Sequence, residues 1–172
     1  RVARGFRAPS IFDFGQLGIT GGGFEVSPAE AVELGAFVGD SAGPNATSTG
    51  IRWTGLQPEV LWSWEGGIRV LRDDLRFEVT AFTSEFSDFI SRRTVIVYRD
   101  VVGRSLGGQA IVSQDAFGRI YVPVDNDPVV SRANIGALRV WGLETLFQKK
   151  FADNWRDTLK ASLQRGEELD TG

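Results

Sequence analysis

Residues 75–81 alternate strictly between apolar and polar side chains. Four apolar residues fall on one side and three polar residues on the other: Leu75, Phe77, Val79 and Ala81 against Arg76, Glu78 and Thr80. Successive side chains of an extended chain point to opposite faces, so this pattern predicts a strand with one apolar and one charged face. Three further stretches repeat the pattern, which favours a large antiparallel sheet.

The chain is predicted to form about five antiparallel strands joined by connections of very unequal length. The strands fall at about 1–7, 56–72, 75–92, 136–151 and 154–166. Three-residue turns at 72–74 and 152–154 alternate with long loops at about 8–55 and 93–135, whereas connections of ~4–6 residues are usual in compact domains. All short turns therefore lie at one end of the sheet. That asymmetry is typical of outer-membrane β-barrels, which have short periplasmic turns and long extracellular loops.

Aromatic residues mark both ends of the predicted apolar face. Trp62, Trp64 and Trp141 lie toward the long loops, whereas Phe151 and Trp155 flank a short turn. The ten residues from Trp141 to Phe151 span roughly 33 Å of strand at ~3.3 Å each. A tilt of about 40° reduces this to a height of about 25 Å, which matches the apolar band of such barrels. Aromatic rings favour both membrane interfaces.

The charged residues of the strands share the opposite face. Seven of them would face a hydrated lumen: Glu65, Arg69, Arg76, Glu78, Glu144, Arg156 and Lys160. This placement is informative because Lys or Arg on the lipid face costs ~2–4 kcal/mol at mid-membrane. Arg139 and Lys149 depart from the pattern, but both lie near strand ends, from which long side chains can reach the headgroups.

Composition excludes several other classes of function. The 172 residues include no Cys and no His, and the net charge is −3 without any basic run. Disulfides, thiolate metal sites, histidine bases and a nucleic-acid surface are therefore not expected. No apolar run approaches the ~20 residues of a membrane helix. We predict neither an enzyme nor a cofactor or metal site, and any membrane crossing would use strands.

The two long loops carry local structural signals of their own. Pro28–Leu34 is predicted to form a short helix, with Ser27 as its N-cap and Glu30 completing a capping box. The second loop contains a β-rich stretch at 95–98 and several turn signals, which indicate a local hairpin. Loops of this length are usually functional or disordered.

Four motifs resemble those of TonB-dependent outer-membrane receptors. Gly5–Ser10 resembles the G-F-R-A-P box, and Leu56–Gly67 resembles the L-x-P-E…E-x-G box. Phe82–Ile90 is similar to the F…D-x-I segment, and Ala133–Glu144 to the N…G-x-E segment. The four matches occur in the family's order. Together they are more specific than any one of them alone.

The resemblance implies a piece of a barrel of ~22 strands whose lumen holds a plug. It also implies a Gram-negative outer-membrane receptor that imports a scarce nutrient such as a ferric siderophore, cobalamin or an oligosaccharide. The TonB complex would supply energy through the plug, which is expected outside this chain. The expected partners are TonB, the nutrient and outer-membrane lipid. The missing histidine weakens a haem-import interpretation.

The candidate ligand contacts lie in the loops and the lumen: Phe6, Arg7, Pro9, Pro58, Glu59, Tyr98 and Tyr121. Most of these residues could instead have a structural role. Arg7 could pair with a carboxylate, Pro9 could fix the loop exit, and Glu59 could lock a strand start. A passive porin-like barrel and a soluble β-sandwich binding module remain alternatives to the receptor.

Overall fold

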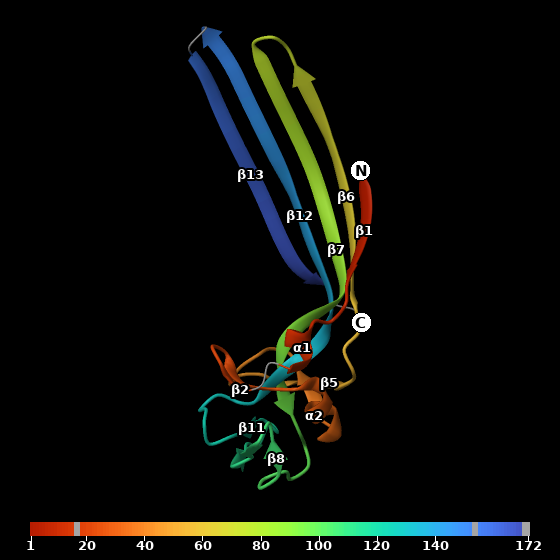
Figure 1. The fold of residues 1–172 in the computed structure, drawn as a ribbon, viewed down its shortest axis with the longest axis vertical. Coiled ribbons are helices and arrows are strands. Elements are labelled where there is room, and N and C mark those ends of the chain that lie inside the picture. Colours follow the sequence, from red (N-terminus) through yellow and green to blue (C-terminus); the bar gives the residue numbers. More distant parts are fainter. Residues whose placement is uncertain (16–17, 153–154, 170–172) are drawn as a thin grey trace. The chain divides into compact units, whose positions relative to one another are not determined.

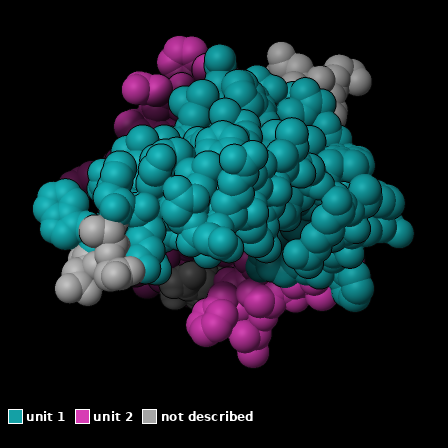
Figure 2. All heavy atoms as spheres, turned by 90° about the horizontal axis from the view of Figure 1, so that it is seen from above, with its two compact units in different colours: residues 1–7, 59–89, 136–172 teal, residues 8–58, 90–135 magenta. Residues whose placement is uncertain are grey.

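The computed structural model describes residues 1–15, 18–152 and 155–169. The chain forms two compact units, which are coloured separately in Figure 2. The strand unit comprises residues 1–7, 59–89 and 136–172, and the loop unit comprises residues 8–58 and 90–135. Each unit is described by itself below.

The strand unit is one open, twisted sheet of long neighbouring strands (Figure 1). Its order is β1-β6-β7-β12-β13, and the pairs β1–β6, β6–β7 and β12–β13 are antiparallel. The strands are β1 (Val2–Arg7), β6 (Glu59–Leu71), β7 (Leu75–Ile96), β12 (Val130–Ala152) and β13 (Trp155–Leu169). This all-β, sequential architecture confirms the predicted fold class of a barrel segment.

Strand pairing determines which side chains share a face of the sheet. Directly paired residues lie on the same side, and the register pairs Ile68 with Val79 but Arg69 with Glu78. Arg69 Nε lies 2.6 Å from Glu78 Oε1, so the charged residues form ion pairs across strands. Ile68 and Val79 therefore lie on one face and Arg69 and Glu78 on the other, as the alternation predicted.

The apolar face of the strand unit remains uncovered. Trp62, Leu143 and Leu163 are 39%, 42% and 63% exposed. In a β-sandwich such residues would pack against a second sheet. A large exposed apolar face instead indicates contact with lipid or another partner. This observation contradicts the β-sandwich alternative.

The polar face also contains aromatic residues that the simple alternation did not predict. Phe82 pairs with Glu65 and therefore lies on the polar side of β7. A Cβ on Gly142 would lie 2.7 Å from the Phe82 ring and 2.5 Å from the carbonyl oxygen of Leu163. Glycine at position 142 thus leaves the space into which the neighbouring ring packs.

Arg139 has carboxylate partners, which the sequence interpretation did not give it. Its Nη2 lies 2.6 Å from Glu85 Oε1, and its Nη1 lies 3.7 Å from Glu167 Oε1. Glu85 pairs with Trp62 and therefore shares the apolar side. Arg139 is thus neutralised by protein carboxylates instead of reaching the headgroups alone. The sequence could not reveal this because the three residues belong to three strands.

Three strands are longer than the alternation indicated. The strand predicted to end near residue 92 continues as β7 to Ile96. The strand predicted to begin near residue 136 begins as β12 at Val130. Residues 94–97 and 129–131 are buried on both faces, so their side chains do not alternate in polarity. The last predicted strand likewise extends to Leu169. The predicted turn at 152–154 includes residues 153 and 154, which lie outside the described residues.

The predicted long loops fold into short elements around a core of their own. The elements are α1 (Ile11–Gly15), β2 (Gly18–Thr20), β3 (Gly23–Val26), α2 (Pro28–Glu33), β4 (Phe37–Gly39), β5 (Ser48–Arg52), β8 (Ser105–Leu106), β9 (Gln109–Ala110), β10 (Ser113–Gln114) and β11 (Ile120–Tyr121). The buried core residues include Phe24, Val26, Leu34, Val38, Trp53, Val95, Val97, Ile111, Ile120 and Val129. Among the described residues, neither helix is long and apolar enough to cross a bilayer.

Helix α2 links the two segments of the loop unit. Ser27 Oγ accepts from the Glu30 N–H, and Glu30 Oε2 accepts from the Ser27 N–H, which confirms the predicted capping box. The other oxygen of Glu30 accepts a 2.7 Å hydrogen bond from the Gly107 N–H. At the other end of the helix, Arg99 donates to the Leu34 carbonyl at 2.8 Å. Residues 90–135 thus supply partners at both ends of a helix from residues 8–58.

A buried ion cluster joins β3 to β12 in the loop unit. Glu25 is 1% exposed, and its Oε1 lies 2.7 Å from Arg132 Nε. Arg92 Nη1 lies 3.9 Å from the second oxygen, Oε2. Beside this cluster, Val130 pairs in parallel with Glu25, and the Ser131 hydroxyl donates to the Val26 carbonyl at 2.8 Å. The charge of Glu25 is thus buried between two guanidinium groups.

Replacing Arg132 with Ala should destabilise the loop unit, because it leaves the buried Glu25 carboxylate with only a distant cation. Loss of one partner of a buried pair costs about 3–5 kcal/mol. We expect amide hydrogen exchange in β3 and in residues 130–133 to accelerate in the full protein, whereas Arg104→Ala, an exposed arginine, should leave it unchanged. Equal exchange in the two variants would contradict the role of this cluster.

Asp88 has an unusual backbone conformation within β7. Its φ is 56°, and it is the only non-glycine residue with positive φ in the described part of the chain. The β6–β7 pairing ends immediately before it, at Val60 opposite Ser87. Asp and Asn tolerate the left-handed region better than other L-residues do. This gives a physical reason for an acidic residue in the D-x-I motif.

Asp88→Val should cost about 1–2 kcal/mol more than Asp88→Gly, because valine disfavours positive φ whereas glycine adopts it freely. Both substitutions remove the carboxylate, so the difference between their stabilities measures the cost of positive φ at this position. The denaturant midpoint of the detergent-solubilised protein would measure it. Equal midpoints would show that the conformation imposes no constraint.

Candidate functional site

Arg7 and Glu59 form an ion pair where β1 ends and β6 begins. They are direct partners in the strand register, and Arg7 Nε lies 2.5 Å from Glu59 Oε2. Glu59 is only 7% exposed, whereas nearly half of the Arg7 side chain is exposed. The pairing matches the structural role considered for both residues. It holds two strand ends together and leaves part of the guanidinium accessible.

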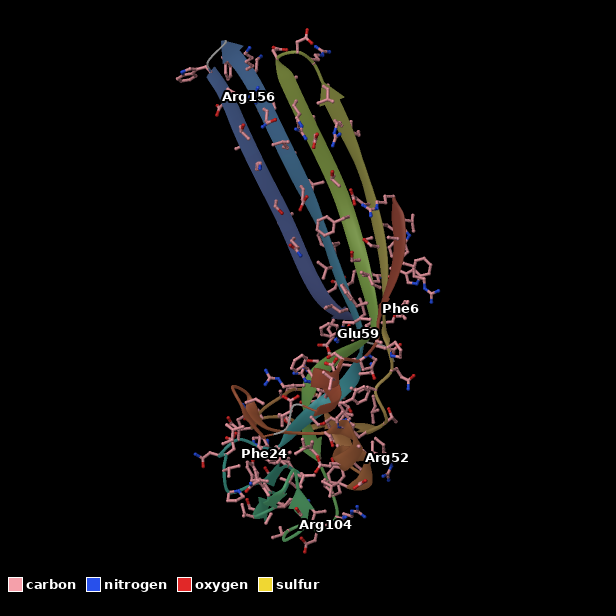
Figure 3. The ribbon with its side chains drawn as sticks, in the orientation of Figure 1. Phe6, Phe24, Arg52, Glu59, Arg104 and Arg156 are labelled. Atoms are coloured by element: carbon pink, nitrogen blue, oxygen red, sulfur yellow. The ribbon has the colours of Figure 1, made fainter. Side chains whose placement is uncertain are left out.

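Phe6, another candidate contact in the strand unit, does not join this pair. Phe6 pairs with Val60 on the other face of the sheet and is 80% exposed (Figure 3). Pro9 and Pro58 belong to the loop unit. The structure therefore brings Arg7 and Glu59 together, while Phe6 faces the apolar side.

Tyr121 belongs to a polar cluster within the loop unit. Its hydroxyl donates to Asp115 Oδ2 at 3.3 Å, and Arg119 Nε donates to the same oxygen at 2.6 Å. Burial, and then the negative charge of Asp115, raise the pKa of Tyr121. The phenol thus stays protonated at neutral pH and holds a turn, which makes a metal-bound phenolate unfavourable here.

Tyr98 lines an open depression of about 510 Å³ in the loop unit, a volume typical of small-molecule sites. Its ring lies 5.4 Å from that of Phe37, at a 58° tilt, and it is 64% exposed. The other lining residues are Leu34, Gly35, Arg52, Val97 and Arg99. Tyr98 and Tyr121, both predicted contacts, thus occupy different environments.

Two arginines line this depression. The Arg52 guanidinium lies 4.8 Å from the Phe37 ring centroid, because β4 and β5 pair these two residues directly. Arg99 Nη2 donates to the carbonyls of Glu33 and Leu34 at the end of α2. Both arginines are exposed, and neither forms an ion pair with a carboxylate among the described residues. The depression therefore has excess positive charge.

The sequence interpretation identified Tyr98 but missed Phe37, Arg52 and Arg99. Phe37 and Arg52 become neighbours only through the β4–β5 hairpin, whose loop contains Gly43-Pro44-Asn45. Recognising that turn as a hairpin would have paired them. No local signal connects Arg99 to the end of α2, because the two are separated by 65 residues.

The arrangement is suited to binding a small molecule. Cationic and aromatic groups line the depression. No cluster of acidic residues that could hold a metal occurs in the described ranges. The available chemistry is recognition of an anionic, flat group by guanidinium and aromatic side chains.

One comparison with known proteins places the chain in a family. The family model described as TonB dependent receptor-like, beta-barrel matches residues 1–168. No curated protein matches the chain. The family match covers all of the described strands except the last residue of β13.

Arg7→Ala should lower the stability of the barrel, because it leaves the nearly buried Glu59 carboxylate without this guanidinium. Partial exposure of Arg7 reduces the expected cost to about 1–3 kcal/mol. Adding Glu59→Gln to Arg7→Ala should restore part of the lost stability. The denaturant midpoint of the purified protein measures both changes, with Arg76→Ala as the exposed control, since Glu78 keeps Arg69. If the double variant were no better than Arg7→Ala, coupling between the two residues would be refuted.

Proposed function

The chain belongs to the TonB-dependent receptor β-barrel family, and from that membership we propose that it imports a scarce nutrient with energy from the TonB complex. The family consists of outer-membrane receptors and transporters of Gram-negative bacteria. The proposal adds the energy source and the class of cargo: a ferric siderophore, cobalamin, an oligosaccharide or a similar compound.

The two faces of the strand unit support a position in the membrane. An aliphatic and aromatic face with Trp62 and Leu163 suits acyl chains and their interface. The opposite face carries the Arg69–Glu78–Arg76 ion pairs, which suit a hydrated lumen or the polar surface of a plug. We propose that the plug, in the full receptor, transmits the pull of TonB.

The loop unit supports a role in ligand capture. Its two segments form a shared hydrophobic core, so they offer a preformed surface instead of two independent flexible loops. The depression beside Tyr98 is large enough to hold a small molecule. Receptor function is favoured over the passive porin-like alternative because the family match covers nearly the whole chain.

Uptake assays in a Gram-negative host test the proposal. Cells carrying or lacking the full receptor would receive radiolabelled ferric catecholate, ferric hydroxamate, cobalamin or maltodextrin at submicromolar concentration. We expect receptor-dependent accumulation of one probe, abolished when TonB is deleted although cell-surface binding persists. Accumulation that continues without TonB would instead establish a passive pore.

A further inference from the structure

We propose that the depression lined by Phe37, Arg52, Tyr98 and Arg99 binds an aromatic carboxylate group of the imported ligand. The inference rests on the proposed uptake function and specifies the chemistry of its cargo. It is carried by three features: uncompensated positive charge, aromatic walls and side chains already held in place.

The positive charge of the depression is concentrated beside one residue, Gly35. A Cβ on Gly35 would lie 3.7 Å from Arg52 Nη1 and 4.0 Å from Arg99 Nη2, so both guanidinium groups lie beside the same backbone position. Gly35 has a φ of +63°, which favours glycine and keeps that position free of a side chain. No carboxylate of the described residues forms an ion pair with either arginine. An anion placed here would relieve the repulsion between the two like charges.

The walls of the depression favour a flat group. The rings of Phe37 and Tyr98 lie at a 58° tilt, and the aliphatic side chains of Leu34 and Val97 complete the lining. Leu34 and Val97 are buried, so an incoming ring would contact an apolar floor. Aromatic rings gain from such tilted contacts beyond the area they bury. The guanidinium fork of arginine matches the two oxygens of a carboxylate.

Both arginines are oriented before any ligand arrives. Arg52 lies over the Phe37 ring at 4.8 Å, and Arg99 is held by two carbonyls at the end of α2. The C-terminal end of a helix carries partial negative charge, which stabilises a cation there. Because these side chains need little further ordering, binding loses less conformational entropy.

Fluorinated probes separate the contributions of charge and ring. The full receptor in detergent would be titrated with 4-fluorobenzoate, its neutral isostere 4-fluorobenzamide and the non-aromatic 4-fluorocyclohexanecarboxylate, followed by fluorine NMR line broadening. We expect 4-fluorobenzoate to bind with a Kd of about 1 mM, as suits so small a ligand. Each of the other probes should bind about 10-fold more weakly.

Substitutions of lining residues test whether 4-fluorobenzoate binds in this depression. Arg52→Gln and Tyr98→Leu change exposed side chains, and each should weaken 4-fluorobenzoate binding about 10-fold. Arg52→Lys should restore only part of the affinity, since lysine keeps the charge but lacks the planar fork. Arg104→Gln, an exposed arginine of the same unit outside the lining, is the matched control and should bind as the unaltered receptor does.

Three results would overturn the inference: no 4-fluorobenzoate binding up to tens of millimolar, equal binding of the neutral isostere, or unchanged binding in Arg52→Gln. The uptake assay provides a separate readout. If TonB-dependent uptake of a probe persists while 4-fluorobenzoate fails to bind, only the cargo assignment is wrong. If 4-fluorobenzoate binds as expected but uptake does not require TonB, the transport proposal is wrong and the anion site stands.

Discussion

The structure depends on the hydrogen bonding of long paired strands whose two faces differ in polarity. A bilayer offers no water to backbone N–H and C=O groups, so a strand that crosses it must pair with neighbours. Pairing fixes the register, and the register determines which side chains meet acyl chains and which meet water. The cross-strand pairs Ile68–Val79 and Arg69–Glu78 lie on opposite faces of the same two strands. Membership of the receptor family is consistent with that physical arrangement.

The sequence predicted the strand unit well because its information is local. Alternation with a period of two assigns β6, β7 and β13 to strands without knowledge of any distant partner. Alternation gave no such information for residues 94–97 and 129–131, where both faces are buried. The capping box at Ser27 and Glu30 was also predictable, since its donors and acceptors lie within one helical turn.

The candidate site was much less predictable, because its residues meet only after folding. Tyr98 was identified as a loop aromatic, but Arg52 approaches Phe37 only through a hairpin, and Arg99 reaches a helix end 65 residues away. Likewise, Arg7 needed a carboxylate, yet only the β1–β6 register shows that Glu59 supplies it. Ion pairs such as Glu25–Arg132, whose members are separated by 107 residues, leave no local pattern to detect.

The contacts of α2 have a consequence for how this protein can be engineered. Glu30 accepts from Gly107 while capping its own helix, and Arg99 caps the opposite end. Transplanting only one of the two segments of the loop unit would strip the helix of partners and open the shared core. The smallest exchangeable module is therefore both segments together, residues 8–58 and 90–135.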